Sequence, residues 1–210
     1  MIRTLLSPRR LLLAGSIAAA ALGAASTAHA GVLVATATNC DDQVLEQPFT
    51  PWLDPAQYVL APAGDLSGGA EGWQLSGAQV VAENEPYYVH GGDEAAALRL
   101  DAGDSAITPS MCVGLLHPTL RFFARNAGGL LGSLRVDVLF EDATGAVQTL
   151  TIGRLADDGD WSPSLPAVVG ANLLALLPGN RTPLAFRFTA TGPGSSWLID
   201  DVYVDPYGKG

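Results

Sequence analysis

Apolar and polar residues alternate with a period of two from Tyr58 onward, and this alternation is the strongest constraint on the fold. Leu134–Val138 shows it cleanly, and Gly, Pro, Asn and Asp interrupt the pattern about every ten residues. Successive side chains of a β-strand point to opposite faces, so the pattern predicts many short strands that each bury one face. The expected strands are 74–82, 87–90, 96–100, 106–112, 120–125, 134–138, 147–152, 184–188 and 197–204. Only residues 170–177 suit a short helix.

Composition and length agree with one domain built from strands. The chain has 210 residues, of which 48% are hydrophobic and 15% charged, with 24 Gly and 14 Pro. These values argue against a disordered acidic segment and against a helix bundle. Eight to ten short strands predict an all-β fold, a two-sheet antiparallel β-sandwich of the jelly-roll type. The net charge of −10 argues against a nucleic-acid partner.

The first thirty residues have the pattern of a secretory signal peptide. Three arginines precede an apolar run at 11–25, and Ala28-His29-Ala30 follows as a small-x-small cleavage site. The run is too short to span a membrane, and no second long apolar run follows. We therefore expect cleavage after residue 30 and a secreted, extracellular protein without a membrane span. The Arg9-Arg10 pair leaves both the general and the twin-arginine export routes open.

Cys40 and Cys112 are the only cysteines of the chain. In an exported protein an even number of cysteines indicates disulfides, and two cysteines allow one connectivity. The bridge would tie an irregular N-terminal segment, 31–57, to the sandwich at 58–206. Residues 207–210 then form a short C-terminal tail.

The two ends of the predicted sandwich carry a family resemblance. Residues 64–73 (GDLSGGAEGW), followed by Gly77, resemble the opening motif of galactose-binding-like jelly rolls, which are common among carbohydrate-binding modules. Residues 197–204 (WLIDDVYV) resemble the closing strand of the same domains. The chain also resembles a group of small exported bacterial proteins of unassigned function, through the stretches 122–126 and 200–206.

The resemblance implies a structural calcium ion held between the opening turn and the closing strand. The matching positions in this chain are Asp65 and Asp201. Calcium prefers six to eight hard oxygen ligands, which carboxylates and backbone carbonyls supply. The chain departs from the motif at Ser67, where a glutamate is usual. The alternative is that Asp200 and Asp201 accept hydrogen bonds from loop amides or pair with an arginine.

Four arginines lie on the polar face of the predicted strands, and this face has two interpretations. Together with Phe123 it can form a sugar platform, on which a ring stacks while guanidinium groups donate to hydroxyls or uronates. Alternatively, the arginines pair across strands with Asp137 and Glu141 on an exposed sheet, and we favour this simpler interpretation. The four residues are Arg121, Arg125, Arg135 and Arg187.

Aromatic side chains outside the predicted core are further candidates for sugar stacking. Trp73 and Trp197 lie in the strands that define the fold, so we expect them in the core. Trp52 and Trp161 lie in irregular segments beside prolines, and we expect them to be exposed. Alternation also turns one of the two tyrosines after Pro86 outward. The candidate ligand-binding residues are therefore Trp52, Tyr88, Arg121, Phe123, Arg125 and Trp161.

No pattern of catalytic residues stands out. After export only His90 and His117 remain as histidines, and neither a Gly-x-Ser-x-Gly elbow nor a His-Glu-x-x-His motif occurs. The sequence therefore predicts a monomeric, non-catalytic module that binds an extracellular glycan or cell-surface polymer. One alternative is a structural or interaction protein of the cell envelope without a sugar site. The other is a small extracellular glycoside hydrolase, which would need two carboxylates converging in a cleft.

Overall fold

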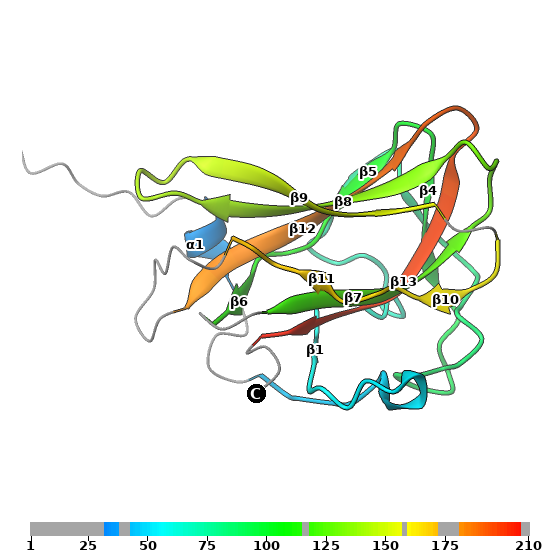
Figure 1. The fold of residues 1–210 in the computed structure, drawn as a ribbon, viewed down its shortest axis with the longest axis horizontal. Helices are drawn as coiled ribbons and strands as arrows, with labels where there is room; N and C mark the ends of the chain where they lie inside the picture. The colour runs from blue at the N-terminus through cyan, green and yellow to red at the C-terminus, as the bar shows by residue number, and fades with distance from the viewer. Residues whose placement is uncertain (1–31, 38–42, 115–117, 157–158, 172–180, 207–210) are drawn as a thin grey trace, which may run out of the picture.

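Two antiparallel sheets face each other in the computed structural model of the chain, which describes residues 32–37, 43–114, 118–156, 159–171 and 181–206 (Figure 1). The helical elements are α1 (Val32–Thr36) and the 3-10 helix η1 (Thr50–Trp52). Neither described helix is long or apolar enough to cross a membrane. The strands are β1 (Val59–Leu60), β2 (Gln74–Ser76), β3 (Gln79–Val81), β4 (Ala97–Asp101), β5 (Ser105–Ile107), β6 (Met111–Val113), β7 (Thr119–Asn126), β8 (Ser133–Glu141), β9 (Val147–Leu155), β10 (Ser162–Pro163), β11 (Ala167–Val168), β12 (Thr182–Thr191) and β13 (Ser196–Asp205).

The topology is that of a jelly-roll sandwich, as the sequence predicts. One sheet has seven strands in the order β10-β7-β13-β4-β3, with β1 beside β13 and β11 beside β7. The other has six strands in the order β2-β5-β12-β8-β9, with β6 beside β12. The chain crosses between the two sheets at most of its connections, so strands adjacent in sequence usually lie in opposite layers.

Two of the predicted strands are each divided in the structure. Residues 74–82 form β2 in the six-stranded sheet and β3 in the seven-stranded sheet. The chain changes sheet at Gly77, where φ is +81° and a Cβ would lie 1.8 Å from Oδ1 of Asp104. Glycine is therefore required at this position. Residues 106–112 are likewise divided between β5 and β6, which both pair with β12.

The predicted strand at 87–90 is wrong, because this segment is a loop. The carboxylate of Glu85 accepts hydrogen bonds from the backbone amides of Tyr87 and Val89, and Tyr88 has φ of +52°. Together these features curl the segment and prevent it from pairing with a sheet. Of the predicted short helix, residues 170–171 form a turn and residues 172–177 lie outside the described residues.

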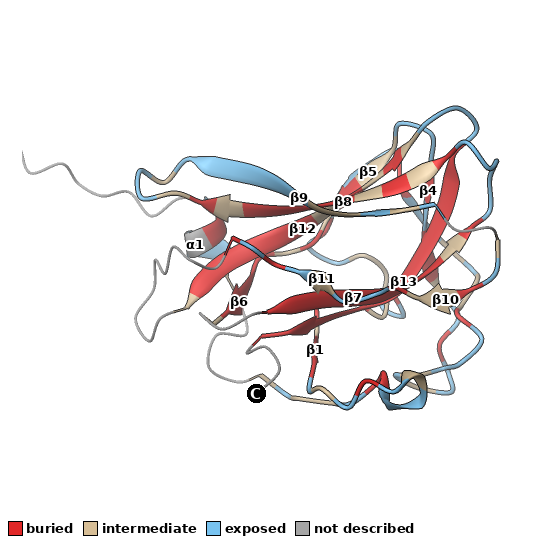
Figure 2. Ribbon diagram, in the orientation of Figure 1, coloured by how far each residue is buried: buried red, intermediate tan, exposed pale blue. Residues whose placement is uncertain are grey.

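The main core lies between the sheets and follows the predicted alternation. Val136 and Val138 of β8 and Phe186 and Phe188 of β12 point inward and are at most 1% exposed. Figure 2 shows the facing strands largely buried, whereas β9 at the edge of the six-stranded sheet is mostly exposed. Trp73 and Trp197 are buried, as predicted.

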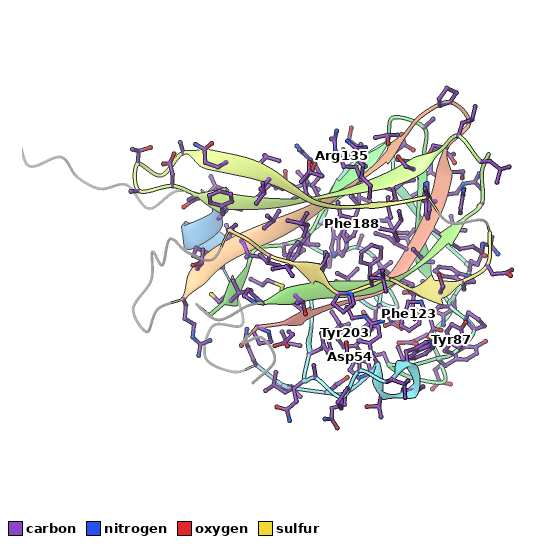
Figure 3. All side chains as sticks on the ribbon, viewed as in Figure 1. Asp54, Tyr87, Phe123, Arg135, Phe188 and Tyr203 are labelled. Atoms are coloured by element: carbon purple, nitrogen blue, oxygen red, sulfur yellow. The ribbon has the colours of Figure 1, made fainter. Side chains whose placement is uncertain are left out.

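A second core covers the other face of the seven-stranded sheet. Residues 43–58, including η1, run across this face (Figure 1), and Figure 3 shows Phe123 and Tyr203 beneath the sheet, on the side opposite Phe188. Every residue of β13 is buried, because both of its faces are covered. The buried members of this aromatic core are Phe49, Tyr58, Ala97, Phe123, Trp161, Leu198 and Tyr203.

Cys112 is fully buried in β6, and its expected partner Cys40 lies outside the described residues. Residue 43, three positions after Cys40, is beside β6, since Nε2 of Gln43 donates a hydrogen bond of 2.9 Å to the carbonyl oxygen of Cys112. The predicted signal peptide, 1–30, and the tail, 207–210, also lie outside the described residues.

Candidate functional site

The loop between β3 and β4, residues 82–96, brings acidic and aromatic side chains to one place on the seven-stranded sheet. The loop is anchored to β13, because the amide of Glu85 donates a hydrogen bond of 3.2 Å to Oδ2 of Asp200. The Glu85 side chain then accepts from two amides of its own loop, those of Tyr87 and Val89. The backbone around the two tyrosines is therefore held by a buried carboxylate.

Below this loop lies a group of buried carboxylates. Oxygen atoms of Glu85, Glu94 and Asp201 lie within 4.8 Å of one another, and these residues are 0%, 8% and 1% exposed. Side-chain atoms of Asp65, His90 and Glu94 that could bind a metal form a second group, in which they also lie within 4.8 Å of one another. Glu94 therefore belongs to both groups. We call these five residues the acidic cluster.

The acidic cluster is electrostatically unfavourable when it is fully ionised. Burial and, after it, the neighbouring carboxylates, Asp200 first among them, together raise the pKa of Asp201 to about 9. Burial likewise raises the pKa of Asp200 to about 8 and also raises that of Glu94. The described arginines that form ion pairs all pair with other acids.

Four oxygen atoms of the acidic cluster have no hydrogen-bond partner among the described residues. They are both side-chain oxygens of Glu94 and both of Asp201. Asp200 differs, because its oxygens accept hydrogen bonds from the amides of Glu85 and Asp201. The alternative in which loop amides satisfy the aspartates therefore describes Asp200 but not Asp201. Buried carboxylates without partners suit a hard cation, and oxygen ligands of this kind suit calcium.

The backbone brings the predicted opening turn and closing strand together. The amide of Val202 donates a hydrogen bond of 3.1 Å to the carbonyl of Gly64, and the amide of Ala61 donates one of 2.8 Å to the carbonyl of Val202. Asp65 follows Gly64 in the chain and Asp201 precedes Val202. Each aspartate belongs to one of the two groups of possible metal-binding residues, and both groups contain Glu94. Asp201 has φ of +47° at an irregularity between Asp200 and Tyr203, which places its side chain in the acidic cluster.

Sequence reasoning did not find Glu85, Glu94 or His90 as members of this cluster. All three come from the 82–96 loop, whose path over β13 depends on contacts with residues more than a hundred positions away. His90 lies 3.9 Å from Asp65 (Nε2 to Oδ2) and 3.8 Å from Glu46 (Nδ1 to Oε2). Nothing in the local sequence distinguishes the two glutamates from the other acids.

The predicted ligand-binding aromatic residues are gathered around the second core, although only part of them faces solvent. The ring centroids of Trp52 and Phe123 are 5.3 Å apart, and those of Trp52 and Tyr87 are 4.9 Å apart. The expected exposure of Trp161 is wrong: the residue is 9% exposed, and Tyr87 donates a hydrogen bond of 3.0 Å to its carbonyl oxygen. Phe123 is fully buried.

Tyr87 and Tyr88 remain accessible, at 46% and 50% of their surface, and Trp52 is partly exposed beside Tyr87. We call Trp52, Tyr87 and Tyr88 the aromatic rim. Figure 3 shows Tyr87 on the same side of the seven-stranded sheet as Asp54 and Tyr203.

The four arginines do not share one face. Arg121 is 4% exposed and pairs with Asp54, and the partly exposed Arg125 pairs with Glu83 at 2.7 Å, with its guanidinium 5.9 Å from the centre of the Trp161 ring. The other two lie on the six-stranded sheet, where both Arg135 and Arg187 pair with Asp137. The predicted cross-strand pairing with Asp137 is therefore confirmed for Arg187 of β12, whereas Arg135 pairs with Asp137 within β8 and Asp137 is buried. Glu141 accepts the amide of Leu33 instead.

Comparisons with known proteins give similar structures but no sequence family. No family model and no curated protein matches the chain. Similar solved structures include a family 61 carbohydrate-binding module in complex with β-1,4-galactotriose, with 17% identity, a TM-score of 0.40 and coverage of 68% of this chain and 94% of that one. They also include the tandem family 22 modules of Paenibacillus barcinonensis Xyn10C, with 15% identity, a TM-score of 0.49 and coverage of 73% and 46%.

A third similar structure is the enzymatically active domain of tailspike protein 4 of bacteriophage CBA120, with 14% identity and a TM-score of 0.48. The match covers 68% of this chain but only 20% of the tailspike chain. The functional assignment of the present chain therefore depends on its own residues.

Proposed function

We propose that this protein is a secreted, non-catalytic carbohydrate-binding module whose ligand stacks on the aromatic rim. The observation that carries the proposal is the half-exposed pair Tyr87 and Tyr88 on a loop held by the buried Glu85 carboxylate. Aromatic rings offer a large apolar surface to the apolar face of a sugar ring, and their hydroxyls can bond to sugar hydroxyls. A loop that is already ordered loses little conformational entropy when the ligand binds.

Calcium has a defined role in this proposal. Glu94 and Asp201 would bind the ion through their unpartnered oxygens, with Asp65 beside Glu94 as a further acidic ligand. The ion would neutralise the buried carboxylates and hold the 82–96 loop against β13. Since the same loop carries Tyr87 and Tyr88, calcium would also stabilise the aromatic rim.

The burial of the acidic cluster favours binding over glycoside hydrolysis. A glycosidase needs two carboxylates that flank a substrate in a cleft. Glu85, Glu94 and Asp201 are at most 8% exposed, so a sugar bond does not reach between them in this conformation. Export is supported by the N-terminal pattern, and N-terminal sequencing of the exported protein tests it by cleavage after Ala30.

A binding assay against a panel of polysaccharides tests the aromatic rim. Affinity electrophoresis and pull-down with neutral plant and bacterial polysaccharides should reveal at least one ligand for the calcium-loaded protein. Tyr88→Asn should weaken its binding at least tenfold, because asparagine tolerates the left-handed backbone but has no ring. Tyr88→Phe keeps the ring and should retain most of the affinity. A folded protein that binds no member of the panel, or a Tyr88→Asn variant that binds like wild type, would overturn the proposal.

A further inference from the structure

The outer face of the six-stranded sheet carries a row of polar side chains. This row is separate from the aromatic rim, which lies on the seven-stranded sheet. In the strand register Arg154 of β9 faces Arg135 of β8, and Arg135 faces Thr189 of β12. Thr189 in turn faces Ser105 of β5, which faces Ser76 of β2. The row crosses the sheet over roughly 19 Å, at about 4.8 Å per strand spacing. Figure 3 shows Arg135 on the side of this sheet away from the core residue Phe188.

Arginines outnumber acids on this face. Nε of Arg135 lies 3.1 Å from Oδ2 of Asp137, and Nη2 of Arg187 lies 2.8 Å from the same oxygen. Asp137 is buried and also accepts a hydrogen bond of 2.6 Å from the Thr151 hydroxyl. Arg154 is exposed and forms no ion pair with the described residues. Two guanidinium groups thus share the Asp137 carboxylate and a third has no carboxylate partner among the described residues, in a chain with a net charge of −10. We call Arg135, Arg154 and Arg187 the arginine face.

The arginine face is organised for a ligand of opposite charge. Asp137 holds Arg135 through Nε and Arg187 through Nε and Nη2, which leaves the two Nη groups of Arg135 and Nη1 of Arg187 without a described partner. These side chains are 30% and 29% exposed. Like charges directly opposite each other on a sheet, as in Arg135 and Arg154, are unfavourable unless an anion lies between them. The hydroxyl of Thr189, next in the row, is buried and has no hydrogen-bond partner among the described residues, so it is not among the groups offered to a ligand.

We propose that the arginine face binds an acidic polysaccharide whose carboxylates pair with Arg154 and Arg135. The guanidinium fork matches a carboxylate in two parallel hydrogen bonds, and the hydroxyls of Ser105 and Ser76 continue the row for neighbouring sugars. The row contains no aromatic ring, so a neutral sugar has nothing to stack on. The site lies on the sheet opposite the aromatic rim and does not depend on it.

The test is affinity electrophoresis and titration calorimetry with polygalacturonate at low salt. Wild type should bind polygalacturonate, and its fully methyl-esterified form, which lacks the charge, should not bind. Arg154→Gln should weaken binding at least tenfold, and Arg154→Lys should weaken it less, because lysine keeps the charge but loses the fork. Arg154 is exposed, so both variants are expected to fold. Arg99→Gln is the matched control, because it removes the charge of a half-exposed arginine in the other sheet, and it should bind polygalacturonate like wild type.

Several outcomes with polygalacturonate would overturn the inference. These are no binding of polygalacturonate by wild type, equal binding of the methyl ester, and equal affinity of Arg154→Gln and wild type. Equally tight binding of dextran sulfate would also overturn it, since it would show attraction to any polyanion. If neutral polysaccharides do not bind while polygalacturonate binds through Arg154, the aromatic-rim proposal fails and this one is supported.

Discussion

Arg121 and Asp54 form a buried ion pair, with Nη1 of the arginine 2.9 Å from Oδ2 of the aspartate and the two side chains 5% and 6% exposed. The hydroxyl of Tyr58 donates to the same oxygen at 2.8 Å, and Nε of Arg121 donates to the carbonyl of Ser164 at 2.9 Å. The guanidinium also lies 4.1 Å from the centre of the Phe49 ring. This network joins the 43–58 segment and the segment after β10 to the middle of β7.

Removal of the arginine should therefore be costly. Arg121→Met leaves the Asp54 carboxylate buried without its cation, and we expect a loss of about 3–5 kcal/mol in the free energy of unfolding. Urea denaturation followed by tryptophan fluorescence measures it. Arg99→Met is the control, because the Arg99–Asp101 pair is more than half exposed and should contribute at most about 1 kcal/mol. Similar losses in the two variants would contradict the role of the buried pair.

Calcium should stabilise the protein through the acidic cluster. Chelation should lower the melting temperature by several degrees, because the cluster loses the charge that neutralises it. Asp201→Asn should remove this response and, in chelator, should melt above wild type, since it removes one buried carboxylate from a repulsive group. Differential scanning calorimetry with and without calcium measures both effects. Asp142, a partly exposed residue between β8 and β9, is the control, and Asp142→Asn should leave the calcium response intact. An unchanged wild-type melting temperature on chelation would exclude the ion.

Asp137 should make stability depend on acid pH. Burial alone would raise the pKa of Asp137, but the hydrogen bonds from Thr151 and Arg187 and the charges of Arg135 and Arg187 outweigh it and hold the pKa below its usual value. A lowered pKa in the folded state adds stability above the unfolded pKa of about 4, and this stability is lost as the pH falls through the folded value. Asp137→Asn should therefore destabilise the protein at pH 7 and less so at pH 3. Urea denaturation of both proteins at pH 7 and at pH 3 tests this prediction. An equal loss in the free energy of unfolding at the two pH values would argue against it.

Cys40 and Cys112 should be bridged in the exported protein. Gln43, three positions after Cys40 in the sequence, contacts the backbone of Cys112. A bridge that closes a loop of about 70 residues contributes about 4 kcal/mol on the chain-entropy model. Intact mass should rise by two hydrogens on reduction. Alkylation of either cysteine in the folded protein without reductant would refute the bridge.

Local patterning accounts for the parts of the fold that were predicted. The alternation in β8 and β12 appears in the structure as inward Val136, Val138, Phe186 and Phe188, because the direction of a side chain in a strand follows from its position alone. The same logic failed at 87–90, where a carboxylate two positions before Tyr87 binds the backbone amides and replaces sheet pairing. It also could not show that β2 and β3 belong to different sheets, since only the turn at Gly77 decides this.

The sequence by itself determined most of the strands and the two-layer sandwich, because alternation and turn residues act over a few neighbouring positions. The resemblance to galactose-binding-like jelly rolls implied that the opening and closing segments meet. Only the tertiary structure decided that Arg121 and Trp161 are buried while Tyr87 and Tyr88 are exposed. It also decided that Glu85 and Glu94 join Asp201, and that Arg154 faces Arg135. The physical reason is that exposure and charge environment depend on which distant segment covers each sheet face. Residues 43–58 cover the outer face of the seven-stranded sheet, whereas in the described part of the chain α1 packs on the outer face of the six-stranded sheet only around Leu139 and Ala185.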